Sequence, residues 1–385
     1  MRELTALRQE IDQLDSQIAQ LFLQRMEVCR EVGEYKKANG LPVLDPQREQ
    51  ELLSAKSALS GDPDAKRALR ALFETVMSES RTLQSGLMED PEKEKAFAGY
   101  LELVHWDGPA LSEQRVLYQG LPGAYCEEAA IRFFGEKCNR MNLKTWDGVF
   151  RGVKEGFGDY GVVPIENSST GSISDVYDLL GQFGCHIVGE QLVRVDQCLL
   201  ALPGANMGTI TDVYTHEQGF RQCRSFLASY PKWGQHEMVN TALAARFVSE
   251  SGDKSKAAIA SRRAAELYDL DILQTSINEN RNNYTRFIIV AADPRYPAGA
   301  DKISVRFTLP HVGGSLCRML QIFARAGLNL EKLESRPIPE ESWSYSFYAD
   351  FTGNLQQGDL DPVIRELINE SSSFRILGNY KAASL

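Results

Sequence analysis

The chain has 385 residues, of which 43% are hydrophobic and 24% are charged, and its formal net charge is −10 at pH 7. This length predicts two or three domains, and the composition is that of an ordinary globular protein. The acidic balance argues against nucleic acid or an anionic membrane as a partner. No apolar run approaches the roughly 18 residues of a membrane span, and residues 1–10 lack the apolar core of a signal peptide.

The seven cysteines are scattered and include no C-x-x-C pair. Such spacing is typical of reduced thiols in a cytoplasmic protein rather than of a disulfide framework or a zinc site. The sequence also lacks a dinucleotide-binding fingerprint and a phosphate-binding P-loop. We therefore expect a cytoplasmic protein that needs no metal and no cofactor.

Residues 4–35 predict one long helix, because apolar side chains recur at spacings of three and four between Leu4 and Val32. Such a helix needs a partner helix, and a second copy of the chain is the simplest source. Arg25 interrupts the apolar seam. Its guanidinium either reaches the surface along its aliphatic stem or points into a cavity between helices.

Two further helices follow, one capped by Asp45 with Pro46 behind it, the other beginning near Pro63. Ser80 and Gln84 occupy positions where the apolar stripe of the third helix would continue. Three helices with polar groups on their inner faces predict a wet, cationic pocket inside a helical bundle.

Over residues 1–88 this pattern resembles the all-helical chorismate mutases. The resemblance implies an intertwined dimer in which Arg25 and the partner chain's Arg8 hold the substrate carboxylates. Lys36 and Gln84 would address the ether oxygen, Asp45 and Glu49 would bind the ring hydroxyl, and the pocket would be completed by Arg48 and Ser80. A pericyclic rearrangement needs no nucleophile, so a cation-rich site without catalytic His or Cys suits it.

Residues 89–113 begin with a run of charges and predict a linker. Residues 114–293 then alternate short strands with helices, which predicts a parallel α/β domain in two lobes with the site between them. Residues 161–173 form an apolar strand that ends in a polar turn before a helix. Such a turn can gather N–H groups toward an anion, although an ordinary strand-to-helix connection fits it equally well.

A polar cluster at residues 283–287, leading into another apolar strand, complements that turn. In this order and separation the two segments resemble the signature motifs of the prephenate dehydratases. The resemblance implies that Thr285 donates to the departing hydroxyl of prephenate. The implied substrate-binding residues are Asn167, Ser168, Thr170, Thr215, Gln222 and Arg286. Glu166 and His216 stay open as the acid behind Thr285, and a lone histidine is more often structural.

Residues 300–385 follow the order β-α-β-β-α-β, which is typical of a ferredoxin-like α+β domain. Their segments 313–316 and 334–337 resemble motifs of the ACT regulatory domains attached to dehydratases. The resemblance implies L-phenylalanine as an effector, held by Gly313, Gly314, Ser315, Leu316, Glu334, Ser335 and Arg336. Without the second segment, the glycine pair would be read as a tight turn.

Together these resemblances imply a bifunctional chorismate mutase–prephenate dehydratase that is inhibited by phenylalanine. A homodimer or higher homo-oligomer is expected, with chorismate and prephenate as substrates. Two alternatives stay open. The central domain could dehydrate arogenate instead, or the chain could be a non-catalytic amino-acid sensor, which would not need the cations of the helical bundle.

Overall fold

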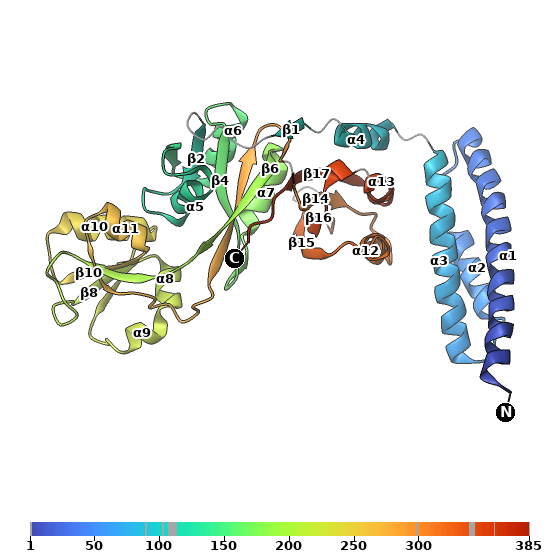
Figure 1. Ribbon diagram of the computed structural model, residues 1–385, viewed down its shortest axis with the longest axis horizontal. Helices are drawn as coiled ribbons and strands as arrows, with labels where there is room; N and C mark the ends of the chain where they lie inside the picture. Colours follow the sequence, from blue (N-terminus) through green and yellow to red (C-terminus); the bar gives the residue numbers. More distant parts are fainter. Residues whose placement is uncertain are drawn as a thin grey trace. The chain divides into compact units, whose positions relative to one another are not determined.

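The computed structural model describes residues 2–88, 91–101, 104–106, 114–297, 299–338, 343–357 and 359–384. The chain divides into two compact units, Met1–Ala98 with Arg365–Glu370, and Gly99–Ile364 with Ser371–Leu385. No helix in the described ranges is long and apolar enough to cross a membrane. Figure 1 labels the helices and many of the strands.

The first unit is helical, as predicted. Its helices are α1 (Leu4–Asn39), α2 (Pro46–Ser57), α3 (Pro63–Leu87) and α4 (Pro91–Leu101). Gly40 ends α1 with a φ of 64°, which favours glycine. The carboxylates of Asp45 and Asp62 cap α2 and α3 by accepting backbone N–H groups, and each cap is followed by proline.

The apolar seam of α1 remains uncovered, although α3 packs against both α1 and α2. Leu14, Ile18 and Leu21 are 51%, 56% and 65% exposed. A contiguous apolar stripe of this kind marks an interaction surface.

The segment predicted to be a linker contains regular structure. Besides α4 it includes β1 (Val104–Trp106), which pairs in parallel with β13 (Arg295–Pro297). The rest of this segment, residues 89–90, 102–103 and 107–113, lies outside the described residues.

The first lobe of the second unit is built on a six-stranded sheet. Its strands, in the order β3-β2-β4-β12-β6 with β5 beside β4, are β2 (Arg115–Gln119), β3 (Asn139–Leu143), β4 (Tyr160–Asn167), β5 (Gly171–Ser172), β6 (His186–Arg194) and β12 (Tyr284–Ala291). Its helices are α5 (Tyr125–Phe134), α6 (Trp146–Lys154) and α7 (Ser174–Phe183).

The second lobe contains a five-stranded sheet in the order β11-β7-β10-β8-β9. The strands are β7 (Cys198–Ala201), β8 (Asp212–Thr215), β9 (Gly234–Glu237), β10 (Lys256–Ala260) and β11 (Asp271–Gln274). The helices are α8 (Glu217–Gln222), α9 (Arg224–Ala228), α10 (Thr241–Ser251) and α11 (Arg262–Leu267). The chain passes between the lobes after β6 and returns after β11.

The predicted two-lobed α/β architecture is confirmed, but the prediction of parallel sheets is wrong. In the first lobe β12 returns from the second lobe and inserts between β4 and β6, antiparallel to both. In the second lobe β7 and β11 run antiparallel to their neighbours, whereas β8, β9 and β10 are parallel. Within the sheets of the two lobes, the parallel neighbours β2, β3 and β4 and the parallel neighbours β8, β9 and β10 are connected by helices, which return the chain to the end of the sheet where the previous strand began.

The C-terminal domain has the predicted ferredoxin-like order. Its elements are β14 (Lys302–Thr308), α12 (Ser315–Arg325), β15 (Leu330–Pro337), β16 (Tyr345–Thr352), α13 (Asp361–Glu370) and β17 (Ser373–Tyr380). The four strands form an antiparallel sheet in the order β15-β16-β14-β17.

This domain and the first lobe share one hydrophobic core. Tyr348, Leu377 and Tyr380 of the C-terminal sheet belong to the same buried cluster as Tyr177 and Ile187 of the lobe. The Tyr348 hydroxyl donates to the carbonyl oxygen of Tyr177 over 2.9 Å. The C-terminal domain and the first lobe are therefore packed against each other through buried side chains.

Two candidate active sites

The helical unit brings Arg25 of α1 against α3. The Arg25 guanidinium donates to Ser80 Oγ and lies 3.5 Å from the carbonyl oxygen of Val76 and from Cys29 Sγ. These partners are neutral, and no carboxylate among the described residues pairs with Arg25. The positive charge of the half-buried Arg25 is therefore not neutralised by any carboxylate among the described residues.

Ser80 and Gln84 face the same side of α3 and are only 4% and 7% exposed. The Oε1 atom of Gln84 is buried and has no hydrogen-bond partner among the described residues. The helices approach closely here, since a Cβ at Gly33 of α1 would come within 3.2 Å of Gln84 Cγ. The predicted residues Arg25, Ser80 and Gln84 thus line the α1–α3 contact.

The other residues predicted for this pocket are more dispersed. Lys36 Nζ donates to the carbonyl oxygen of Val43 over 2.7 Å, and Asp45 serves as the cap of α2. Arg8 and Arg48 are exposed. Glu49 pairs with Arg81 over 2.5 Å, with both side chains largely buried. Arg81 was not predicted from the sequence, because it lies one position off the stripe that carries Ser80 and Gln84.

In the first lobe, Asn167 at the end of β4 lies opposite Thr285 at the start of β12. Asn167 Oδ1 accepts the backbone N–H groups of Ser169 and Thr170 over 2.9 and 3.1 Å. Its Nδ2 donates to Thr285 Oγ1 over 2.9 Å and to Asn283 Oδ1 over 2.8 Å. The turn thereby fixes the orientation of the amide, and Thr285 accepts from it. The hydroxyl proton of Thr285 stays available to another acceptor.

A series of amide side chains links this pair to the second lobe. Asn280 Nδ2 donates to Ser169 Oγ over 2.9 Å, and the Asn280 carbonyl oxygen accepts from Asn278 over 2.6 Å. Asn278 Oδ1 accepts the backbone N–H of Gln197, whose side chain donates to Gln222 Oε1, each over 3.1 Å. The predicted residue Gln222 therefore connects to the site through four residues that were not predicted as site residues: Gln197, Asn278, Asn280 and Ser169.

Other predicted residues have structural partners. The hydroxyl of Thr215 is fully buried and donates to the carbonyl oxygen of Ile259 over 2.7 Å, so it joins β8 to β10. His216 caps α8, where its Nδ1 accepts the Gln218 N–H over 3.2 Å. Ser168 is exposed, and its hydroxyl accepts the Tyr284 N–H over 2.9 Å. Thr170 is exposed beside Asn167, to which its hydroxyl donates over 3.3 Å.

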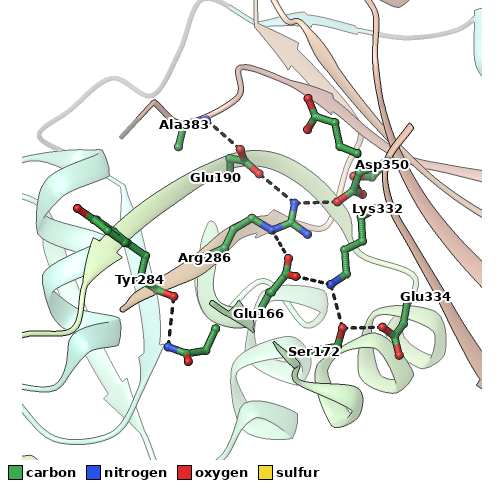
Figure 2. A network of polar contacts seen from close by, with 12 residues as sticks. Glu166, Ser172, Glu190, Tyr284, Arg286, Lys332, Glu334, Asp350 and Ala383 are labelled. Atoms are coloured by element: carbon green, nitrogen blue, oxygen red, sulfur yellow. Dashed lines mark hydrogen bonds and ion pairs between the residues drawn. The ribbon is translucent and has the colours of Figure 1, made fainter. Parts of the chain in front are cut away.

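Arg286 does not lie where the sequence predicted. Its guanidinium is 2.7 Å from Asp350 and 3.2 Å from Glu190, and its Nε is 3.4 Å from Glu166 (Figure 2). Burial disfavours the charged form, but Asp350 and Glu190 outweigh that penalty and raise the pKa of Arg286 well above its usual value. These carboxylates already satisfy its charge, so the position does not support binding of a substrate carboxylate.

The same network continues into the C-terminal domain. Lys332 Nζ of β15 is 2.8 Å from Glu166 Oε1 and 2.9 Å from Ser172 Oγ, and Ser172 donates to Glu334 over 2.5 Å (Figure 2). Arg336 pairs with Asp178 of α7 over 2.7 Å. Glu334 and Arg336, predicted to bind an effector, thus turn toward the first lobe.

The remaining predicted effector residues lie near a cavity of about 320 Å³ in the C-terminal domain. Gly313 and Ser315 line it, together with aromatic residues that include Trp343 and Phe347. The other predicted effector residues are not among its lining residues: Gly314, Leu316, Glu334, Ser335 and Arg336. Metal-binding clusters of three or more His, Cys, Asp or Glu side chains are absent from the described ranges.

Comparison with known proteins divides the chain in the same way. Residues 7–85 match the family Chorismate mutase type II, and residues 116–295 match the family Prephenate dehydratase. The bifunctional chorismate mutase/prephenate dehydratase of Aquifex aeolicus (strain VF5) is 30% identical over 386 residues, covering 100% of this chain and 99% of the relative.

Solved structures resemble a large part of the chain. The prephenate dehydratase of Arthrobacter aurescens in complex with L-Phe is 29% identical with a TM-score of 0.64, covering 70% of this chain and 90% of that chain. A structure described as a novel type of quorum quenching acylase is 30% identical with a TM-score of 0.65, covering 70% and 98% of the two chains.

Proposed function

Because the chain belongs to the family of bifunctional chorismate mutase/prephenate dehydratases, we propose that its two reactions take place at the two sites described above. The enzyme rearranges chorismate to prephenate and then removes water and CO2 from prephenate to give phenylpyruvate, in the biosynthesis of phenylalanine. The first reaction belongs to the helical unit and the second to the two-lobed domain.

The observation that carries the mutase assignment is the unneutralised charge of Arg25. Chorismate is a dianion, and a half-buried guanidinium with only neutral partners is suited to receive one of its carboxylates. As the C–O bond breaks and the new C–C bond forms, negative charge grows on the ether oxygen. Gln84 and Lys36 are the proposed donors to this oxygen, and no proton transfer or covalent intermediate is required.

The rest of the proposed mutase pocket follows the family pattern. Asp45 and Glu49 would bind the ring hydroxyl, and Arg48 and Ser80 would complete the pocket, where Ser80 also contacts Arg25. Arg8 is exposed in its own chain and would reach the pocket of a second copy. The uncovered apolar seam of α1 supports this homodimer, since a partner α1 would remove it from water.

For the dehydratase, the arrangement of Asn167 and Thr285 supports Thr285 as the donor to the departing hydroxyl. Asn167 Nδ2 occupies one lone pair of Thr285 Oγ1, which leaves the threonine proton free and strengthens it as a donor. The departing hydroxyl takes a proton from Thr285 Oγ1 and leaves as water, the ring carboxylate is lost as CO2, and the electron pair of the broken C–C bond completes the aromatic ring. Thr285 then regains a proton from solvent. Ser168, Thr170 and Gln222 are the proposed substrate-binding residues around it.

Phenylalanine is the proposed effector, and the related dehydratase in complex with L-Phe supports this choice. The cavity beside Gly313 and Ser315 offers backbone groups and aromatic surface to an amino acid. We also place the enzyme in the cytoplasm, where its seven free cysteines would stay reduced.

The decisive experiment is to incubate the full-length protein with chorismate and to follow prephenate and phenylpyruvate over time. Prephenate and arogenate are then supplied separately as substrates of the second site. We expect both reactions, with prephenate preferred. Conversion of arogenate with no turnover of prephenate would overturn the substrate assignment, and failure to consume chorismate would overturn the mutase assignment.

A further inference from the structure

Two adjacent pairs of opposing residues on β4 and β12 point to opposite faces of the sheet. Asn167 is opposite Thr285, and the preceding residue Glu166 is opposite Arg286. Because successive side chains of a strand point to opposite faces, the first pair faces the dehydratase site while the second faces the C-terminal domain. The register shifts directly after Arg286, a bulge that ends this pairing.

The second pair is held by residues of the C-terminal domain. Lys332 Nζ of β15 forms an ion pair with Glu166 Oε1 over 2.8 Å, and Asp350 Oδ2 of β16 forms an ion pair with Arg286 Nη1 over 2.7 Å. Glu166 and Arg286 are themselves 3.4 Å apart. The side chains of Arg286 and Asp350 are only 11% and 12% exposed, so water screens their contact little, whereas Glu166 is 36% exposed and its contact with Lys332 is screened more.

We propose that these four residues, Glu166, Arg286, Lys332 and Asp350, form a rear clamp that positions Asn167 and Thr285 for dehydration. The inference rests on the proposed dehydratase function of that pair. Arg286 and Lys332 are positioning residues: they touch neither substrate nor the departing hydroxyl. They hold the backbone of the two strands at the point where the catalytic side chains emerge.

The clamp also gives the C-terminal domain a physical route to the site. Lys332 donates to Ser172 Oγ as well, and Ser172 donates to Glu334, a residue that the sequence assigns to effector binding. A ligand that displaces β15, which carries both Lys332 and Glu334, changes the partners of Lys332 and therefore its contact with Glu166. Small displacements suffice, because a shift of about 1 Å at reacting groups can cost on the order of a hundredfold in rate.

The test uses the full-length enzyme and compares Lys332→Gln, Asp350→Asn, Arg286→Gln and Arg286→Lys. We expect kcat for prephenate to fall about 10- to 100-fold in Arg286→Gln, with KM changed less than about twofold, and Arg286→Lys to recover part of the rate. Lys332→Gln is expected to lower kcat and to weaken inhibition by phenylalanine. The chorismate mutase rate of each variant reports on the integrity of the other unit.

Arg375→Gln is the matched control. Arg375 also joins the C-terminal domain to the first lobe, donating to the carbonyl oxygens of Gly184 and Cys185 over 2.6 and 3.1 Å, but it contacts no member of the clamp. Its variant is expected to keep the wild-type kcat. An equal loss of kcat in Arg375→Gln would mean that any loosening of the interface slows dehydration, and the clamp would be rejected.

Pairwise coupling gives a second criterion. Glu166→Gln and Lys332→Gln both remove the same contact of the rear clamp. The fold-decrease in kcat of the double variant should therefore be smaller than the product of the fold-decreases of the two single variants. If Glu166 instead supplied the proton, Glu166→Gln would abolish turnover and Lys332→Gln would not affect it, which overturns the proposal. Wild-type kcat and inhibition in folded Lys332→Gln and Asp350→Asn would also overturn it, even if Arg286→Gln fails to fold. A wild-type enzyme inactive on prephenate would refute the proposed function itself.

Discussion

Gly378 of β17 lies directly against the backbone of Ile187 of β6. A Cβ added at Gly378 would be 2.0 Å from the carbonyl oxygen of Ile187, a distance that no side chain can occupy. The contact joins the C-terminal domain to the first lobe through main chain rather than through adjustable side chains.

Gly378→Ala is therefore expected to push the two domains apart. The strain of overpacking predicts a loss of about 1–3 kcal/mol in unfolding free energy. Thermal unfolding monitored by circular dichroism measures it. Gly313→Ala, where a Cβ would meet nothing within 4 Å, is the control for stability. An unchanged unfolding temperature in Gly378→Ala would contradict the close contact.

Arg25→Ala is expected to remove most chorismate mutase activity, with a loss on the order of 3–5 kcal/mol in transition-state stabilisation if the guanidinium is a desolvated carboxylate partner. Dehydratase activity on supplied prephenate should survive. Arg30→Ala is the control, since Arg30 is an exposed arginine of the same helix that pairs with Glu27. Both activities falling together in a folded Arg25→Ala protein would show that the sites are not separate.

Thr285→Ala is expected to abolish dehydration while prephenate still binds. Losing a donor that acts mainly in the transition state lowers kcat by about 10²- to 10³-fold and changes KM little. Thr285→Ser keeps the hydroxyl and should keep part of the rate. Steady-state kinetics and equilibrium binding of prephenate provide the comparison, and near-normal turnover in Thr285→Ala would remove this residue from the mechanism.

Asn167→Asp tests the orientation of the amide with almost no change in size. The substitution places a carboxylate oxygen where Nδ2 now donates to Thr285 Oγ1 and Asn283 Oδ1. Thr285 would then turn its own proton toward the new carboxylate and away from substrate, so kcat should fall strongly. Steady-state kinetics on prephenate measures the loss, and retention of kcat would show that the amide proton does not orient Thr285.

The stability of the second unit should depend on pH through His186. Burial, followed by the nearby charges of Arg375 and Lys154, lowers the pKa of His186 to about 4. A histidine whose folded pKa lies below its unfolded value of about 6.5 gives its full stabilisation above pH 6.5 and loses it as the pH falls through 4. With its partial exposure discounted, the change is on the order of 2 kcal/mol. Denaturant unfolding between pH 7.5 and 4.5 measures this, and His186→Gln should flatten the dependence.

Much of the local structure could be predicted from the sequence, because its signals are local. The cap at Asp45 followed by Pro46 and the interruption of the apolar seam at Arg25 both correspond to observed features. The motif pair also anticipated that Asn167 and Thr285 come together. In contrast, the insertion of β12 between two antiparallel neighbours depends on pairings between residues 90 or more positions apart, which no local pattern encodes.

The ion pairs of Arg286 with three carboxylates could not be predicted from the sequence for a different reason. Its neighbour Thr285 belongs to the site, and a positive charge next to a site suggests an anion-binding role. The alternation of side chains along β12 sends the two in opposite directions, and the carboxylates of Glu190 and Asp350 come from segments whose proximity is set only by the tertiary fold. Gln197 and Asn278 were missed for the same reason, since they lie on crossover segments outside any periodic element.

The shared core between the first lobe and the C-terminal domain has a consequence for how this enzyme can escape feedback control. A chain that ended before β14 would expose Tyr177 and Ile187 and leave Arg286 beside fewer carboxylates, so the truncated catalytic domain should be unstable. Selection for phenylalanine-resistant strains should therefore yield point substitutions around the effector cavity or in β15, with premature stop codons rare among the survivors.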